Sequence, residues 1–130
     1  HPGDAVGDLY RLVTTQNYMA VTGACLMVKK ELFEKVGGLD TGFAVSLNDV
    51  DFCLKLRKEG YLNVFTPFAE LYHFESISRG LDDTGEKAQR YYKESEVFRD
   101  KWKEELAKGD PYYNPNFSLD RSDYSLKIEA

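Results

Sequence analysis

The sequence has little cysteine, a single tryptophan and only four prolines among 130 residues, and it has no long apolar run. A membrane-spanning helix needs about 20 consecutive apolar residues, so the printed chain holds no candidate for one. No segment has the pattern of a secretory signal peptide. An excess of basic residues is also missing, because the net charge is −5. Without a basic stripe, binding of nucleic acid through its phosphates is not expected.

The two cysteines, Cys25 and Cys53, lie in apolar segments and lack the spacing of a metal site. We therefore expect two buried free thiols and a reducing compartment, which is typical of a cytoplasmic protein. The chain begins with His1 rather than Met. We expect it to be part of a longer polypeptide, in which a membrane segment could lie elsewhere.

Several sequence motifs of catalysis are missing. There is no H-E-x-x-H, no Walker loop, no G-x-G-x-x-G and no nucleophile elbow. The D-x-D of Asp49 and Asp51 does not fit an EF-hand loop, because Cys53 and Leu54 stand where an oxygen ligand and a glycine are needed. Zinc-protease, P-loop, dinucleotide, calcium and serine-hydrolase chemistry are all disfavoured.

The length and the 42% of hydrophobic residues suffice for one domain with a core. Apolar patterning predicts strands over 20–29, 62–65 and 69–73, and helices over 30–36, within 44–60 and over about 84–108. The fold class is therefore α/β, with a short mixed sheet, packed helices and a long C-terminal helix. A helical stripe on that last helix is expected in the core: Ala88, Tyr91, Tyr92, Ser95, Phe98, Trp102 and Leu106. The tail that follows is predicted to wrap over the surface, held by Tyr112, Tyr113 and Phe117.

The helix within 44–60 is the segment around which the rest is organised. The helical angular step places one broad apolar face opposite a polar face. Asp49 projects on the apolar side, into the protein or a pocket, whereas Asp51 is predicted to point outward. Arg57 falls on the apolar arc, so it either extends to solvent or has an inward partner.

Three features have two readings each on the residues alone. Asp49 could cap the free amides of the helix, the commoner case, or act as a general base. Gly23 could mark a close approach to the backbone or tight packing against a helix. His73 could be structural or a metal ligand. The polar segment 75–86 is a candidate mobile loop.

Four motifs in order carry a resemblance: TGACLMV at 22–28, ELFEKVGGLD at 31–40, NDVDFCLKLRKEGY at 48–61 and YHFESIS at 72–78. Together they resemble family 2 glycosyltransferases, more closely the carboxy-terminal half of the GT-A catalytic domain. The likeness extends more weakly to DPYYNPN at 110–116, which is similar to bacterial O-antigen and rhamnosyl-type surface-polysaccharide transferases. It implies that residues 1–130 are the acceptor-side half of a GT-A domain, whose nucleotide-binding half is absent.

The resemblance implies a role for each matching residue. Asp49 would be the catalytic base that takes the proton of an acceptor hydroxyl, and the transfer would invert the anomeric carbon. His73 would help hold a divalent metal, Mn or Mg, on the donor diphosphate. Asn48 stands where the family usually has an acidic residue. Substrate contacts would come from Gly23, Ala24, Asn48, Ser78 and Arg79.

The implied activity is a hexosyltransferase-type glycosyltransferase of cell-surface polysaccharide synthesis, located in the cytoplasm at the inner face of the membrane. Its partners would be a nucleotide-sugar donor, a glycan acceptor and the missing N-terminal half of the chain. Peripheral membrane association and a dimer through the exposed half-domain surface are further expectations, and the fragment alone is expected to be inactive. The alternative is a non-catalytic interaction or carbohydrate-binding module that keeps the fold. Asn48 and the tyrosines favour that alternative.

Overall fold

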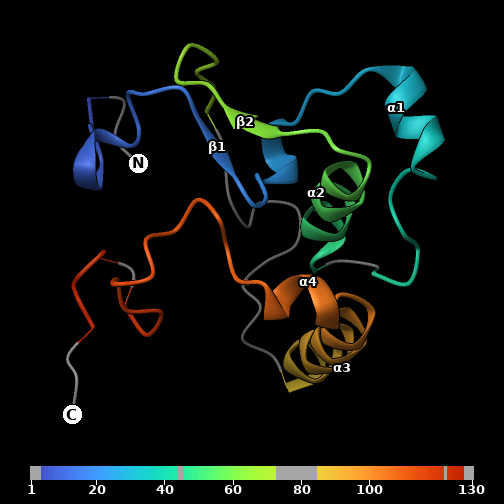
Figure 1. Ribbon diagram of the computed structural model, residues 1–130. Helices are drawn as coiled ribbons and strands as arrows, with labels where there is room; N and C mark the ends of the chain where they lie inside the picture. The colour runs from blue at the N-terminus through green and yellow to red at the C-terminus, as the bar shows by residue number, and fades with distance from the viewer. Residues whose placement is uncertain (1–3, 44–45, 73–84, 122, 128–130) are drawn as a thin grey trace.

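The computed structural model describes residues 4–43, 46–72, 85–121 and 123–127, with the side chains of 86 and 87 left out. The helices are α1 (Lys30–Lys35), α2 (Asn48–Lys58), α3 (Gly85–Lys101) and α4 (Lys103–Ala107), and the 3-10 turns are η1 (Asp8–Tyr10) and η2 (Gly23–Cys25). Strands β1 (Gln16–Tyr18) and β2 (Asn63–Phe65) pair antiparallel, with Asn17 opposite Val64. Helix α2 lies between this sheet and the pair formed by α3 and α4 (Figure 1).

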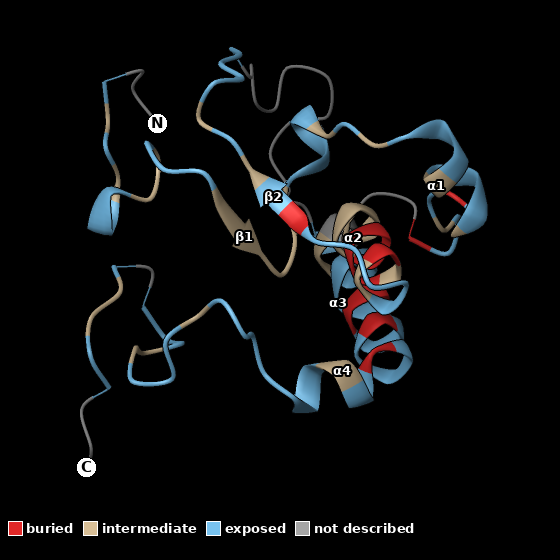
Figure 2. Ribbon diagram, turned by 45° about the horizontal axis from the view of Figure 1, so that its top comes forward, coloured by how far each residue is buried: buried red, intermediate tan, exposed pale blue. Residues whose placement is uncertain are grey.

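The core sits where α2 meets α3. Phe43 and Leu54 pack there with Phe98 and Trp102, and the rings of Phe43 and Phe98 are 6.0 Å apart in an edge-to-face arrangement. Figure 2 shows the buried positions concentrated along α2 and the facing side of α3. Burial of these apolar side chains is the main force that holds the two helices together.

Much of the predicted architecture is confirmed. The α/β class holds, and the expected helices over 30–36 and within 44–60 correspond to α1 and α2. The strand expected at 62–65 is β2. Helix α2 ends where predicted, with Gly60 in the left-handed conformation at a φ of 85°. The sheet of the described residues consists of the two antiparallel strands alone.

The strand predicted over 20–29 is wrong. The strand lies earlier, at β1, and the apolar run forms the turn η2 instead. Thr22 explains the difference, because its hydroxyl accepts a hydrogen bond from the amide of Ala24 at 3.3 Å. Such a local bond offers the backbone an alternative to a sheet. No strand forms over 69–72 either, and His73 lies outside the described residues.

The long C-terminal helix is present but interrupted. Trp102, with φ −109° and ψ 18°, separates α3 from α4. The predicted core stripe is correct for Ser95, Phe98 and Trp102, which are buried. It is wrong for three of its members, which are exposed: Tyr91, Tyr92 and Leu106.

Tyr112 attaches the tail to α2, as predicted, whereas the ring contacts of Tyr113 and Phe117 lie within the tail itself. Tyr112 accepts a hydrogen bond from Arg57 at 2.8 Å, and its ring lies 5.0 Å from the guanidinium. Of the two alternatives for Arg57, the structure shows a partner, but at an exposed site rather than inside the protein. Tyr113 and Phe117 pack edge to face with ring centres 5.9 Å apart, and Tyr124 joins both rings.

Large apolar side chains remain on the described surface. Met27, Phe68 and Tyr72 are almost fully exposed, at 96%, 88% and 93%. Exposed apolar surface was expected of a half-domain, and association of two copies through it stays a prediction. Among the described helices, none has the length and apolar character needed to cross a membrane.

Candidate functional site

The candidate site is the start of α2 and the turn η2 beside it. Leu47 precedes the helix in a left-handed conformation, with φ 63° and ψ 2°, and provides no side-chain cap. Its carbonyl accepts the first helical hydrogen bond, from the amide of Asp51 at 2.8 Å. The chain therefore turns sharply at Leu47 and places Asp49 on the first turn.

The carboxylate of Asp49 bridges two segments that are far apart in the sequence. One oxygen accepts a hydrogen bond from the amide of Gly23 at 2.8 Å, and the other accepts one from the amide of Val50 at 2.8 Å. A Cβ atom added at Gly23 would lie 3.2 Å from the Cβ of Asp49. This neighbour belongs to helix α2, so the contact agrees with both readings of Gly23, close approach to the backbone and tight packing against a helix.

This geometry is compatible with both interpretations of Asp49, as a helix cap and as a general base. The bond to Val50 satisfies one of the free amides at the start of the helix, as a cap would. Each carboxylate oxygen has two acceptor sites, and within the described ranges a single donor is bonded to each oxygen. Asp49 is half-buried and its partner Gly23 is exposed, so the pair lies at the surface of the described residues.

Asp51 was predicted to point outward, and this is wrong. Its side chain is fully buried, and it accepts a hydrogen bond from the indole nitrogen of Trp102 at 2.9 Å. Ion pairs join it to Lys55 at 3.1 Å and to Lys101 at 2.7 Å. The prediction assumed that α2 buries a single apolar face. In the structure α2 is covered on two sides, and the second side, which carries Asp51, packs against α3.

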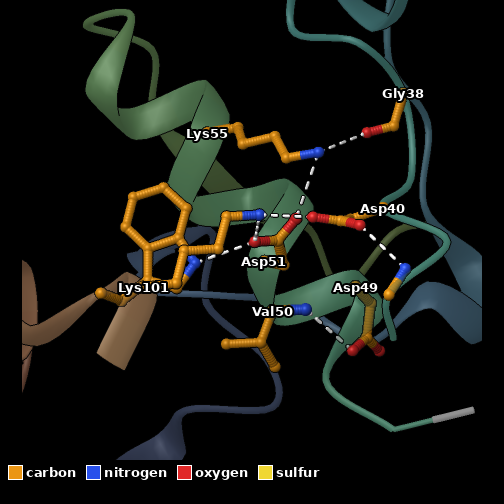
Figure 3. Close-up of polar contacts among 9 residues, drawn as sticks. Gly38, Asp40, Asp49, Val50, Asp51, Lys55 and Lys101 are labelled. Carbon is orange, nitrogen blue, oxygen red and sulfur yellow. Dashed lines mark hydrogen bonds and ion pairs between the residues drawn. The ribbon is translucent and has the colours of Figure 1, made fainter. Parts of the chain in front are cut away.

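Figure 3 shows this ion-pair network and, apart from it at the helix start, Asp49. Lys101 also pairs with Asp40 at 2.6 Å, and the amide of Gly42 donates to Asp40 at 2.9 Å. The hydrogen bonds from Lys101 and Gly42 lower the pKa of Asp40. Partial burial works to lower the pKa of Lys101, but its bonds to Asp40 and Asp51 outweigh this, and that pKa is raised.

The cysteines differ from each other. Both thiols are free, but only Cys53 is buried, so the expectation for Cys25 is wrong. Cys25 ends the exposed turn η2 rather than a buried strand. Burial raises the pKa of the Cys53 thiol, whose sulfur lies 3.5 Å from the amide nitrogen of Val21.

The structure brings together part of the predicted site. Gly23 and Asp49 are in contact, Ala24 follows on the exposed turn, and Asn48 is the half-buried first residue of α2. The others lie outside the described residues: His73, Ser78 and Arg79. Within the described ranges no three His, Cys, Asp or Glu side chains are grouped as metal ligands. The metal site predicted around His73 therefore stays a prediction.

Sequence reasoning missed the residues that attach α3 to this site. Glu94 is buried and accepts a hydrogen bond from the amide of Ser46 at 2.8 Å. Lys101 and Trp102 reach Asp51. The one available signal was the single tryptophan on a helical core stripe, because a buried indole needs an acceptor. Its partner is 51 residues away, and no local pattern reveals such a distance.

Comparison with known proteins confirms the resemblance predicted from the sequence, to surface-polysaccharide transferases. The O-antigen biosynthesis protein RfbC of Myxococcus xanthus is 38% identical over 87% of this chain. An N-acetylglucosaminyl-diphospho-decaprenol L-rhamnosyltransferase of Mycobacterium tuberculosis is 35% identical over 60% of it. A Sinorhizobium fredii protein, uncharacterized protein y4gI, is 49% identical over 97% of it.

The chain spans only a small part of these relatives, 8%, 25% and 14% of their respective lengths. No family model matches the chain. No solved structure matches it either.

Proposed function

We propose that the chain is part of an inverting glycosyltransferase that moves a sugar from a nucleotide-sugar donor to a glycan acceptor in surface-polysaccharide synthesis. The observation that carries the proposal is the sequence identity of 38% with RfbC and 35% with the rhamnosyltransferase over most of this chain. The geometry at Asp49 is compatible with it, since this carboxylate lies at the surface of the described residues beside the turn η2, with a single donor from those residues on each oxygen.

In this proposal Asp49 is the general base. It takes the proton of an acceptor hydroxyl while that oxygen attacks the anomeric carbon of the donor. The bond between that carbon and the diphosphate oxygen breaks, and its electron pair leaves with the diphosphate. Attack from the side opposite the leaving group inverts the configuration. The amides of Gly23 and Val50 hold the carboxylate in one orientation, which reduces the ordering needed in the transition state.

A divalent metal, with His73 among its ligands, remains part of the proposal and would stabilise the departing diphosphate. Ser78 and Arg79 are proposed contacts of the donor phosphates. These residues lie outside the described ranges. A cytoplasmic location at the inner membrane face, and an N-terminal segment that binds the nucleotide, are proposals of the same kind.

The test is Asp49→Asn in the full-length protein, measured by nucleotide release from a panel of nucleotide sugars with and without acceptor. We expect turnover to fall by about two or more decades, as is usual when a general base is removed. Glu31→Gln is the matched control, because Glu31 is an exposed acidic residue of another helix, α1, and should leave turnover unchanged. Near-normal turnover of Asp49→Asn would refute the base role.

The alternative is a glycan-binding or interaction module without catalysis. Asn48 at the helix start and the exposed ring pair Tyr91 and Tyr92, 6.1 Å apart, favour it. Saturable glycan binding by the chain without nucleotide or metal, lost in Tyr92→Ala, together with no turnover by the full-length protein, would support this module.

A further inference from the structure

Glu94 is a buried carboxylate that the proposed chemistry does not use. It lies on α3, 7% exposed, and is followed on the buried side of that helix by Ser95 and Phe98. Its carboxylate accepts a hydrogen bond from the backbone amide of Ser46 at 2.8 Å. Ser46 stands three positions before Asp49, so a residue 48 positions away in the sequence holds the chain that presents the candidate base.

Between those two positions the backbone is strained. Leu47 has a φ of 63°, in the left-handed region that costs a residue with a side chain about 1–2 kcal/mol. Strain of this kind persists only where the surroundings hold it in place. The turn at Leu47 is fixed on both sides. Before it, the carboxylate of Glu94 accepts a hydrogen bond from the amide of Ser46, and after it, the carbonyl of Leu47 accepts one from the amide of Asp51. Leu47 itself packs against the core formed by α2 and α3.

We propose that Glu94 is a positioning residue for Asp49, because it fixes the strained turn that sets the carboxylate against the amide of Gly23. Without the acceptor on Glu94, the amide of Ser46 loses its partner and the turn at Leu47 relaxes. The first turn of α2 then shifts, and the hydrogen bond from Gly23 to Asp49 lengthens or breaks. The strength of the hydrogen bond between Gly23 and Asp49 therefore reports whether Glu94 fixes the turn at Leu47. The catalytic consequence rests on the proposed function, whereas the structural consequence does not.

Other contacts of α3 do not replace Glu94 in this role. Lys101 and Trp102 attach to Asp51, on the far side of Asp49 from Leu47. They anchor the end of the first helical turn. Further back in the chain, Asp40 and Phe43 are tied to α3 by the ion pair with Lys101 and by the ring contact with Phe98. Among the hydrogen bonds of the described residues, the bond from Ser46 to Glu94 is the one that ties the backbone next to Leu47 to α3.

The test is hydrogen–deuterium exchange by mass spectrometry on the full-length protein, read in peptides covering 20–26 and 46–52. Glu94→Met keeps the length of the side chain and removes the acceptor, and Glu94→Gln keeps an acceptor oxygen. We expect exchange in both peptides to rise by about three- to tenfold in Glu94→Met, the equivalent of one hydrogen bond. Glu94→Gln should match the wild type, and so should Glu96→Met, which changes an exposed glutamate of the same helix.

Unchanged exchange in the 20–26 peptide of Glu94→Met would overturn the inference. If Glu94→Met raises exchange throughout α1 as well, the protein has unfolded globally, and Glu94→Asp is read in its place. The shorter carboxylate should then raise exchange in the two peptides alone, and a wild-type pattern in Glu94→Asp would overturn the inference equally.

The second readout is nucleotide release. Misplacement of a catalytic group by about 1 Å can cost a hundredfold, so we expect kcat of Glu94→Met to fall by about ten- to a hundredfold. The KM for donor should stay within about twofold, because Glu94 is buried away from substrate, and Glu94→Gln should restore kcat. Wild-type kcat in Glu94→Met, where Asp49→Asn is inactive, would overturn the positioning role. Full activity of Asp49→Asn would refute the proposed base but leave the exchange test of Glu94 intact.

Discussion

Replacing Asp51 by asparagine removes one buried negative charge and keeps almost the same shape. In the native protein that carboxylate is completely inaccessible and faces two ammonium groups, those of Lys55 and Lys101. An asparagine oxygen can still accept the indole hydrogen bond of Trp102. Asp51→Asn therefore isolates the contribution of this buried charge, which pairs with Lys55 within α2 and with Lys101 of α3.

The expected loss in the free energy of unfolding of Asp51→Asn lies between two limits. Breaking a fully buried ion pair costs about 3–5 kcal/mol, and a surface pair is worth about 0–1 kcal/mol. Lys55 and Lys101 are 18% and 34% exposed, and each keeps a second partner, the carbonyl of Gly38 and the carboxylate of Asp40. We therefore expect Asp51→Asn to lower the free energy of unfolding by about 2–3 kcal/mol.

The assay is urea denaturation followed by the fluorescence of Trp102, the single tryptophan of the chain. Asp40→Asn is the matched control, because Asp40 binds the same lysine from the surface, with a side chain 36% exposed. That change should cost about 0–1 kcal/mol. In a double-mutant cycle with Lys101→Met, the coupling to Asp51 should be about 1–2 kcal/mol, reduced from the buried limit by the exposure of the lysine.

A loss below about 0.5 kcal/mol for Asp51→Asn, the range of an ordinary surface substitution, would refute the reasoning. It would mean that the cost of burying the charge cancels its attraction to the two lysines.

Three further outcomes follow from the described residues. A thiol reagent should label Cys25 rapidly and Cys53 only on unfolding, since Cys53 is buried and its pKa is raised; equal labelling rates by mass spectrometry would contradict this. The pKa of Asp40 is lowered in the folded protein, so Asp40 stabilises the fold above pH 3.8, its ordinary pKa, and this stabilisation is lost as the pH falls through the folded pKa. The pKa of Lys101 is raised, so Lys101 stabilises the fold below pH 10.5, and this stabilisation is lost as the pH rises through the folded pKa. The contribution of these two groups to the urea midpoint should therefore be constant between these limits and fall beyond both, and removal of Lys101 should diminish each fall. Gly60→Ala should cost about 1–2 kcal/mol through its φ of 85° alone, since an added Cβ would meet nothing within 4 Å, and a neutral result in denaturation would exclude that strain.

The helices were readable from the sequence because their signals are local. Apolar spacing over 48–58 and the glycine at position 60 define α2 without knowledge of any other segment. The resemblance to polysaccharide transferases was also carried by local motifs. The strand over 20–29 was misread because an apolar run of that length does not distinguish a strand from buried irregular structure, and the hydroxyl of Thr22 favoured a turn.

The sequence by itself determined the order of the helices, the α/β class, the aromatic anchoring of the tail and the choice of Asp49 as the candidate base. Only the tertiary structure decided that Asp51, two positions later, is fully buried, that the amide of Gly23 binds the candidate base, and that Glu94 binds the amide of Ser46 before it. The physical reason is that helical periodicity reports one buried face of a helix. Whether a second face is covered, and by which distant charge or amide, depends on contacts across about 26 to 51 residues, which no local pattern records.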